Sequence, residues 1–202
     1  MPTATNTNGR TNANGRTTIS PEPRLGQHGR ETQPFDTLRN LPIGLPAKAR
    51  LESCRLLNEI LADSMVLTAL YKKHHWLVAG PTFYQLHLLF DKHAAEQLEI
   101  VDLVAERVQS LGGIAVGDPR HAAGLTRIPR PPDGAEPVAA MIDRLLEAHT
   151  SVIERVRKGI DATEKSGDWG SNDLLMSDVL RRHELQVWFV AEHVVEMPLV
   201  KA

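Results

Sequence analysis

Residues 72–113 read KKHHWLVAGPTFYQLHLLFDKHAAEQLEIVDLVAERVQSLGG, and this stretch decides the fold. The apolar spacing before it predicts a helix over residues 47–78. Gly80 and Pro81 break that helix, and a second helical pattern over residues 82–111 ends at two glycines. Because the connection between the two patterns is so short, we expect the two helices to be antiparallel neighbours.

The sequence that follows contains a long connection and then two more helices. Residues 112–135 are rich in glycine and proline and have no steady hydrophobic period. Helices are predicted over residues 136–165 and 171–196, with a tight turn between them. Short, long and short connections between four helices are typical of a ferritin-like bundle. The predicted fold class is therefore all-α, a ferritin-like four-helix bundle with a long crossover between its second and third helices.

Composition sets the broad class of the protein. The chain has 202 residues, 42% of them hydrophobic and only 4% aromatic, with a formal net charge of −2. This length excludes a multidomain enzyme, and this charge gives no general attraction to nucleic acid or membrane. The single Cys54 excludes a disulfide framework. No apolar run is long enough to span a membrane, and no secretion signal is evident, so we expect a cytoplasmic protein without a membrane partner.

The first 45 residues differ in composition from the rest of the chain. They are rich in Thr, Asn, Gly and Pro, which predicts a flexible N-terminal arm over residues 1–45 and a bundle domain over residues 46–202. The arm contains TNTNGR and TNANGR in tandem, and each copy ends in a Gly-Arg pair. Arg10 and Arg16 of these copies are candidate contacts to DNA phosphates, which would make the protein nucleoid-associated. A plain solvated tail is the alternative.

Residues suited to metal binding occur in pairs at helical spacing. His87 and Asp91 are four residues apart, as are Asp102 and Glu106, so each pair projects from one face of the second helix. His75 continues the apolar stripe of the first helix. Mixed nitrogen and oxygen donors suit iron, manganese or zinc, and we favour iron. Alternatively, these pairs decorate solvated faces or satisfy one another in the core.

The distance between the two pairs predicts a dimer. Fifteen residues separate them, which returns them to nearly the same helix face but places them roughly 22 Å apart. One helix therefore cannot bring both pairs to one ion. A second copy, related by a two-fold axis near residues 96 and 97, would set His87 and Asp91 against Asp102 and Glu106 of its partner. The spacing predicts an isologous dimer with two identical metal sites.

Several motifs together closely resemble the Dps family of ferritin-like mini-ferritins, over essentially the whole body from about residue 46. The matching segments are Lys73 to Gly80 with Pro81-Thr82-Phe83, Leu86-His87 before Phe90-Asp91, Asp102 with Ala105-Glu106-Arg107, and Leu111-Gly112-Gly113. The resemblance implies that the ferroxidase ligands are His75, His87 and Asp91 from one subunit, with Asp102 and Glu106 from its two-fold neighbour.

The resemblance also implies an activity. Such a protein is a hollow dodecamer that oxidises Fe(II), preferably with hydrogen peroxide rather than dioxygen, and stores the Fe(III) mineral, which protects DNA from oxidative damage. One alternative is a structural nucleoid protein that binds DNA through its arms, with the metal site secondary. Another is a site occupied mainly by zinc, which competes for the same ligands and shows little redox turnover.

Further residues have two readings each. Trp76, beside a presumed ligand, could intercept stray oxidising equivalents as in relatives or anchor an interface. In the family, acids near the start of the last helix line the pores through which iron enters. The corresponding acids here are Asp168, Asp173 and Asp178. Capping of the helix and compensation of its dipole explain the same acids. His74 could add a ligand, or be an exposed or hydrogen-bonded ring. We expect the remaining helical histidines to be structural or on the surface: His93, His149, His183 and His193.

Overall fold

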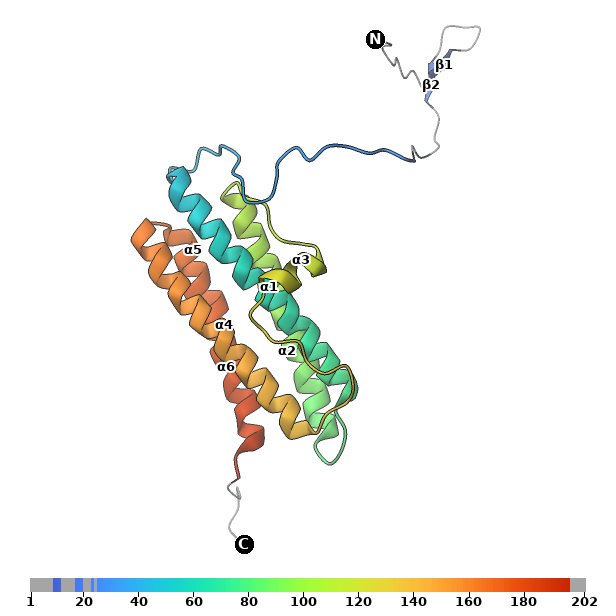
Figure 1. Ribbon diagram of the computed structural model, residues 1–202, viewed down its shortest axis with the longest axis vertical. Coiled ribbons are helices and arrows are strands. Elements are labelled where there is room, and N and C mark those ends of the chain that lie inside the picture. Colours follow the sequence, from blue (N-terminus) through green and yellow to red (C-terminus); the bar gives the residue numbers. More distant parts are fainter. Residues whose placement is uncertain (1–8, 12–16, 20–22, 24, 197–202) are drawn as a thin grey trace. The chain divides into compact units, whose positions relative to one another are not determined.

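The computed structural model describes residues 9–11, 17–19, 23 and 25–196, and the chain divides into two units, Met1–Thr32 and Gln33–Ala202. In the first unit, β1 (Gly9–Thr11) pairs antiparallel with β2 (Thr17–Ile19), with Arg10 opposite Thr18 (Figure 1). This hairpin, whose second strand follows the repeat, is absent from the sequence prediction. Arg16 lies outside the described residues, so the arm's proposed DNA contacts stay predictions.

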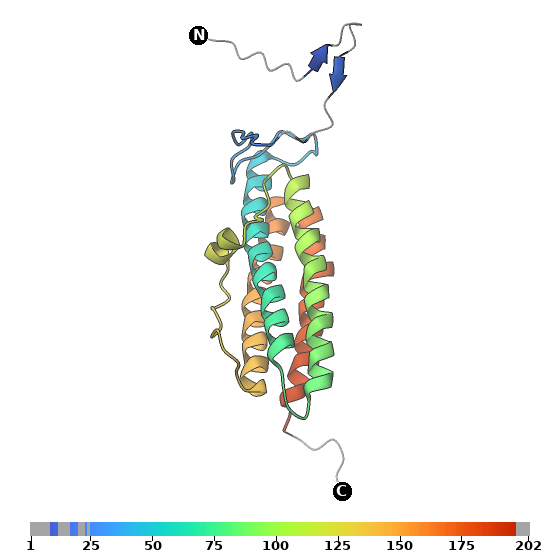
Figure 2. The ribbon, with the colours of Figure 1, turned by 90° about the vertical axis from the view of Figure 1, so that its right-hand side faces the viewer.

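The second unit is a bundle of four long helical segments, as Figures 1 and 2 show. The first three are single α-helices, and the fourth is assembled from consecutive helical pieces. The segments are α1 (Ala47–Leu77), α2 (Phe83–Ser110), α4 (Val138–Ser166), and then α5 (Trp169–Leu174), η1 (Leu175–Leu180), α6 (Arg181–Ala191) and η2 (Glu192–Val194). The predicted all-α bundle is confirmed. None of the helices among the described residues is long and apolar enough to cross a membrane.

The connection between α1 and α2 is as short as predicted, and two glycines close the far end of α2. Gly112 has a φ of +87°, and a Cβ atom there would lie 2.6 Å from the backbone oxygen of Arg39. A Cβ atom on Gly113 would lie 2.6 Å from the sulfur of Cys54. Both positions therefore require glycine, the first for its backbone conformation and for space, the second for space alone.

The long crossover is attached to α1 through buried polar side chains. Asn58 donates to the carbonyl of Ile114 and accepts from the amide of Val116. The carboxylate of Asp63, fully buried, accepts from the Thr126 hydroxyl at 2.7 Å and pairs with Arg155 at 2.7 Å. These contacts fix the crossover, including its short helix α3 (Pro119–Leu125), along the bundle.

The segment just before α1 also belongs to the bundle unit. The Arg39 amide donates to the Gly112 carbonyl at 2.7 Å, and the Arg50 guanidinium donates to the Arg39 carbonyl at 2.9 Å. Asp36 forms a bidentate ion pair with Arg55, with both N to O distances 2.7 Å. The compact unit accordingly starts at Gln33, whereas composition placed the boundary after residue 45. Composition cannot reveal these hydrogen bonds, because they join distant parts of the chain.

The fourth segment begins earlier than predicted and changes its pitch. Asp168 caps α5 by accepting from the Ser171 amide, so the helix starts at Trp169 rather than at residue 171. The next six residues, η1, form a π-helix, which has a wider turn than an α-helix. This wider turn changes which residues of α6 face the core.

Candidate metal centre

His75 and His87 meet at the end of the bundle where α1 connects to α2. His75 lies in the last turn of α1, and His87 lies just past the first turn of α2. The short antiparallel connection places them at the same level, and their rings stack with centroids 3.8 Å apart at an interplanar angle of 21°. Both rings are half-buried. The structure therefore brings these two predicted ligands together.

Reciprocal hydrogen bonds fix the tautomer of both rings. His75 Nδ1 lies 2.8 Å from the His87 carbonyl oxygen, and His87 Nδ1 lies 2.9 Å from the His75 carbonyl oxygen. A carbonyl oxygen only accepts, so each Nδ1 carries the proton and each Nε2 keeps its lone pair. Within the part of the chain that the structure describes, neither Nε2 has a hydrogen-bond partner. In the neutral form of each ring, this is the arrangement in which a histidine binds a metal through Nε2 while a backbone oxygen orients its ring.

Asp91 lies one turn beyond His87 and is held by a lysine. Lys72 Nζ is 2.5 Å from Asp91 Oδ1. The hydrogen bond from Lys72 lowers the pKa of Asp91, so the carboxylate is ionised at neutral pH. A metal cation that binds Asp91 must displace the lysine ammonium, which therefore competes for this ligand.

Asp102 and Glu106 lie farther along α2, and both are exposed. Asp102 is eleven residues beyond Asp91, a rise of about 16 Å. The described residues contain no group of three or more His, Cys, Asp or Glu side chains that could hold a metal ion. The five predicted ligands are therefore not assembled within one chain.

The face of α2 that carries the predicted ligands also carries apolar side chains that are uncovered in the single chain. Tyr84, Leu88 and Leu98 are exposed by 68%, 50% and 60% of their surface. Their spacing along α2 places them on the side of the helix that also carries Asp91 and Asp102. Trp76, at the end of α1, is 70% exposed. Exposed apolar side chains in such a line are typical of an interface between subunits.

Asp168 has the surroundings of the capping alternative and not those of a pore-lining residue. It is only 2% exposed, accepts from the Ser171 hydroxyl at 2.6 Å, and pairs with Arg107 at 2.5 Å. Burial alone would raise its pKa, but the hydrogen bonds of Ser171 and the charge of Arg107 lower the pKa below its usual value. Asp168 therefore caps a helix and ties it to Arg107. Asp173 and Asp178 are exposed and stay candidates for a pore.

Among the other histidines, only His74 differs from both of its predicted surroundings, whereas His93, His149, His183 and His193 lie in the core or on the surface as expected. His74 is fully buried against Phe90, and burial lowers its pKa to about 4. Neither of its ring nitrogens has a hydrogen-bond partner among the described residues, so it is neither exposed nor hydrogen-bonded there. His193 is exposed and bonded to the Phe189 carbonyl. The remaining three lie together in the core, a grouping that the sequence does not reveal because each comes from a different helix: His93, His149 and His183.

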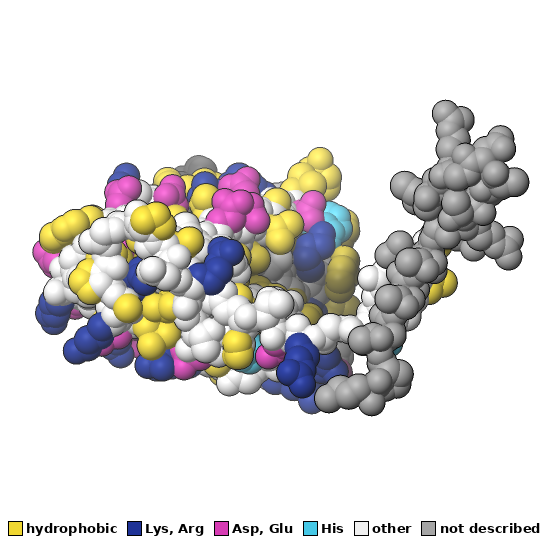
Figure 3. All heavy atoms as spheres, turned by 90° about the horizontal axis from the view of Figure 1, so that it is seen from above, with side chains coloured by type: hydrophobic (Ala, Val, Ile, Leu, Met, Phe, Trp, Pro, Cys, Tyr) yellow, Lys and Arg dark blue, Asp and Glu magenta, His cyan; other side chains and the backbone are white. Residues whose placement is uncertain are grey.

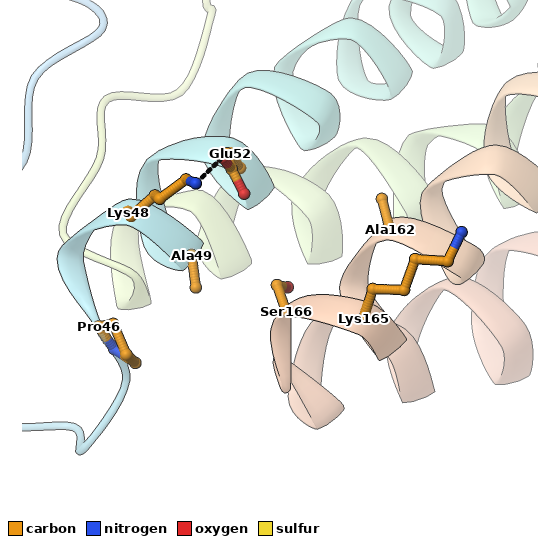
Figure 4. Close-up of a pocket in the computed structure, with 7 residues that line it drawn as sticks. All are labelled: Pro46, Lys48, Ala49, Glu52, Ala162, Lys165 and Ser166. Carbon is orange, nitrogen blue, oxygen red and sulfur yellow. Dashed lines mark ion pairs between the residues drawn. The ribbon is translucent and has the colours of Figure 1, made fainter.

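A shallow pocket of about 460 Å³ lies at the opposite end of α1 from His75 (Figure 4). It is lined by residues of α1 and the preceding proline on one side and by the last turns of α4 on the other: Pro46, Lys48, Ala49, Glu52, Ala162, Lys165 and Ser166. Lys48 and Glu52 face each other there at 3.9 Å. The lining of this pocket contains no histidine or cysteine, and the pocket lies away from the predicted metal ligands. On the face shown in Figure 3, acidic and basic side chains are interspersed and neither sign dominates.

A four-helix bundle with a full-length crossover between its second and third helices is typical of the ferritin-like class of proteins. A family model described as Ferritin-like domain matches residues 54–200. The chain belongs to the Dps family of ferritin-like proteins.

Relatives of known and unknown role support this family assignment. The chain is 31% identical over 152 residues to the DNA protection during starvation protein of Agrobacterium fabrum, covering 75% of this chain and 93% of the relative. It is 57% identical over 150 residues to an uncharacterised protein of Kitasatospora aureofaciens, covering 74% of this chain and all of the relative. Among solved structures, DpsC from Streptomyces coelicolor has a TM-score of 0.84 and 57% identity, covering 85% of this chain and 100% of that one.

Proposed function

We propose that this protein is a ferroxidase that oxidises Fe(II), preferably with hydrogen peroxide, and stores the Fe(III) product inside a cage of its own subunits. The observation that carries the proposal is the pair of reciprocal hydrogen bonds between His75 and His87. These bonds hold two neutral imidazoles with free Nε2 atoms beside the ionised Asp91. Such a donor set suits Fe(II), and carboxylates stabilise the Fe(III) that forms.

The complete site is proposed to form between two subunits. Asp102 and Glu106 are exposed, charged and distant from the histidines of their own chain. An antiparallel α2 from a two-fold partner brings the partner's copies of these carboxylates to His75 and His87. The same packing covers the exposed Leu88 and Leu98, which gives the dimer an apolar contact. Two identical sites result for each dimer.

Each residue then has a defined task towards the substrates. The two imidazoles and three carboxylates bind Fe(II), and Lys72 leaves Asp91 as the cation arrives. Hydrogen peroxide accepts two electrons from two Fe(II) ions and yields two Fe(III) ions and two hydroxide ions. The reaction removes Fe(II) and peroxide together, the two reactants that generate hydroxyl radicals near DNA.

Storage requires a closed assembly, which we propose to be a dodecamer. Iron would reach the interior through pores lined by Asp173 and Asp178, both exposed on the fourth helical segment. Zinc would compete for the same five ligands without redox turnover. The proposed location is the cytoplasm, where reduced iron is available as substrate.

The decisive experiment separates the two halves of the site onto different chains. One variant carries His75→Ala with His87→Ala, and the other carries Asp102→Ala with Glu106→Ala. Each variant alone should fail to oxidise Fe(II) after anaerobic loading and addition of peroxide. Mixed dimers, made by dissociating and reassembling both variants together, contain one site with all five ligands and should regain activity.

The control is a mixture of each variant with itself, treated in the same way. Recovery of Fe(III) absorbance only in the mixed sample, with iron co-eluting in a large particle on size exclusion, supports the intersubunit ferroxidase. Equal activity in both separate variants would refute it. Tight metal binding without oxidation in the unmodified protein would favour the zinc alternative.

A second candidate function is DNA binding through the N-terminal arm, with the metal site secondary. It is favoured by the name of the Agrobacterium relative, a DNA protection protein, and by the arginines of the arm, including Arg10 and Arg16. Many weak arms on one particle can bind DNA with useful avidity. Deleting residues 1–32 removes the arm and keeps the segment that packs on the bundle. The deletion should abolish a salt-sensitive DNA shift and preserve iron oxidation; unchanged DNA binding would exclude the arm.

A further inference from the structure

Four polar rings, one from each helical segment of the bundle, meet in its core. They are Tyr71 from α1, His93 from α2, His149 from α4 and His183 from α6, and none is more than 1% exposed. The Tyr71 hydroxyl lies 2.6 Å from His149 Nε2 and 3.2 Å from His93 Nδ1. His149 Nδ1 lies 2.9 Å from His183 Nδ1. A core of apolar residues surrounds this chain of hydrogen bonds.

The π-helical turn is what directs His183 into this chain. Leu175, Val179 and His183 are all fully buried and follow one another at steps of four residues. In an uninterrupted α-helix, each step of four residues would rotate by about 40° away from the core. A π-helix has more residues per turn than an α-helix, so steps of four residues through η1 rotate less around the axis. His183 therefore stays on the buried face. π-helical turns are rare and occur often at functional sites, and this one ends shortly before His183.

The hydrogen bonds allow two directions along the chain of rings, because the donor and acceptor roles of the ring nitrogens depend on the tautomers; the direction in which Tyr71 donates to His149 is the one that supports proton transfer from the phenol. If the Tyr71 hydroxyl donates to His149 Nε2, then His149 carries its proton on Nδ1 and donates to His183 Nδ1. His183 then carries its proton on Nε2, which has no hydrogen-bond partner among the described residues. In this direction His93 Nδ1 donates to the oxygen of Tyr71. The phenol thus has a proton acceptor at short distance, followed by a second acceptor.

Burial keeps His149 and His183 neutral in the resting protein, and the same burial makes each ring a weaker base than a solvated imidazole. Desolvation lowers the pKa of His149 well below its ordinary value, and lowers the pKa of His183 to about 3. Desolvation also raises the pKa of the Tyr71 phenol well above its ordinary value, so Tyr71 retains its proton in the resting protein. The phenol can therefore lose its proton to His149 only together with an electron.

Tyr71 lies close to the proposed site of iron oxidation. It precedes His75 by four residues on α1, a rise of about 6 Å. Packed rings continue between the two places: the ring centroid of Phe90 is 6.0 Å from that of Tyr71 and 6.4 Å from that of His74. Phe90 also precedes the proposed ligand Asp91 directly. An electron can therefore leave Tyr71 for the metal centre through contiguous protein.

We propose that Tyr71 is an oxidisable residue that supplies one electron when a site holds a single Fe(II). This inference rests on the proposed ferroxidase function. One Fe(II) reduces hydrogen peroxide to hydroxide and a hydroxyl radical, and becomes Fe(III). The hydroxyl radical takes one electron from Tyr71 and becomes a second hydroxide. The phenol proton moves to His149 Nε2, leaving a neutral phenoxyl radical on Tyr71 and an imidazolium on His149.

The chain has only two tyrosines, Tyr71 and Tyr84, which makes the proposal simple to test. Tyr84 is 68% exposed and lies nearby on α2, so Tyr84→Phe is the matched control for Tyr71→Phe. The assembled protein is loaded anaerobically with one Fe(II) per site, mixed with hydrogen peroxide and freeze-quenched for electron paramagnetic resonance. A phenoxyl signal is expected in the unmodified protein and in Tyr84→Phe, and its loss in Tyr71→Phe. A signal that survives in Tyr71→Phe, or no phenoxyl signal in any folded protein that oxidises iron, overturns the proposal.

An iron-free measurement separates this proposal from the ferroxidase function. Azide radicals generated by pulse radiolysis oxidise exposed aromatic residues of the Tyr84→Phe variant. Tyr71 should then lose an electron to the oxidised residue, which is measured as the absorbance of a phenoxyl radical. If the protein fails to oxidise iron but forms a phenoxyl radical in this iron-free experiment, the ferroxidase function is refuted and Tyr71 is still oxidisable. Absence of the phenoxyl radical here, with iron oxidation intact, would refute the role of Tyr71 alone.

The role of His149 as proton acceptor is tested by His149→Gln, which keeps a polar side chain in the core. The phenoxyl radical should form more slowly, and its rate should lose its sensitivity to deuterium oxide. The rate at which this variant oxidises two Fe(II) ions per site should be unchanged, and this unchanged rate is the control for correct assembly. An unchanged phenoxyl rate and isotope effect would show that His149 is structural.

Discussion

Two groups of histidines in this molecule have the same side chains and opposite surroundings. His75 and His87 are half-buried at the end of the bundle, and backbone oxygens occupy their Nδ1 atoms. His149 and His183 are fully buried in the core, and their Nδ1 atoms bond to each other. The first pair leaves its Nε2 atoms free at a half-buried position that a ligand can reach, whereas the second pair is enclosed in the core and its Nδ1 atoms bond to each other. The function of a histidine here depends on which of its nitrogens remains free and on whether a ligand can reach that nitrogen.

The largest expected effect is the loss of iron oxidation when one ring is removed from the pair His75 and His87. His87→Ala should reduce the rate of Fe(II) oxidation by more than about 100-fold, because it removes a direct ligand. Its thermal unfolding midpoint should change little, since a half-buried hydrogen bond contributes about 1 kcal/mol. Stopped-flow absorbance of Fe(III) and a thermal melt provide the two readings. If His87→Ala lost as much stability as a core variant, the proposed difference between the two groups of histidines would be contradicted.

The reverse pattern is expected when a ring is removed from the core. His149→Ala leaves the Tyr71 hydroxyl and a ring nitrogen of His183 without their partner and also creates a cavity. The expected loss in the free energy of unfolding is about 2–4 kcal/mol. Oxidation of two Fe(II) ions per site should persist at temperatures where the variant stays folded. Chemical denaturation of both variants side by side measures the contrast, and equal midpoints would contradict it.

Acidification should act on the core group through protein stability. Burial lowers the pKa of His93 to about 4 and that of His183 to about 3, both from an unfolded value of 6.5, and lowers the pKa of His149 as well. Below pH 6.5 the unfolded chain binds protons that the folded core does not, so stability falls as the pH decreases towards 4. Each such histidine contributes at most about 1.4 kcal/mol per pH unit. Melts between pH 7.5 and 5 should show this slope, with exposed His193→Ala as the unaffected control.

The smallest expected effect concerns the lysine that occupies Asp91. Lys72→Met frees the carboxylate, so Zn(II) or Co(II) should bind about two- to fivefold more tightly, in the range of an exposed ion pair. Lys73→Met is the matched control, because Lys73 bonds to the Gly134 carbonyl instead of Asp91. Isothermal titration at fixed pH measures both variants. Equal affinities would show that Lys72 does not compete with the metal.

The sequence by itself determined the helices and the proposed ligands. Breakers such as Gly80-Pro81 and Gly112-Gly113 act locally, and the four-residue spacing of His87 with Asp91 follows from helix geometry alone. The bundle prediction is therefore confirmed with small shifts at helix ends. The five ligands stay a prediction, because a single chain does not assemble them.

Only the tertiary structure decided which distant residues meet. It joined Arg107 to Asp168, packed Arg39 against Gly112, buried His74, and gathered Tyr71 with three histidines from three other helices. Hydrophobic periodicity tells which face of a helix is buried, but it carries no information on the partner that a polar group finds on that face. Those partners depend on the packing of helices far apart in sequence, and in the fourth segment on a π-helical turn that shifts the buried face.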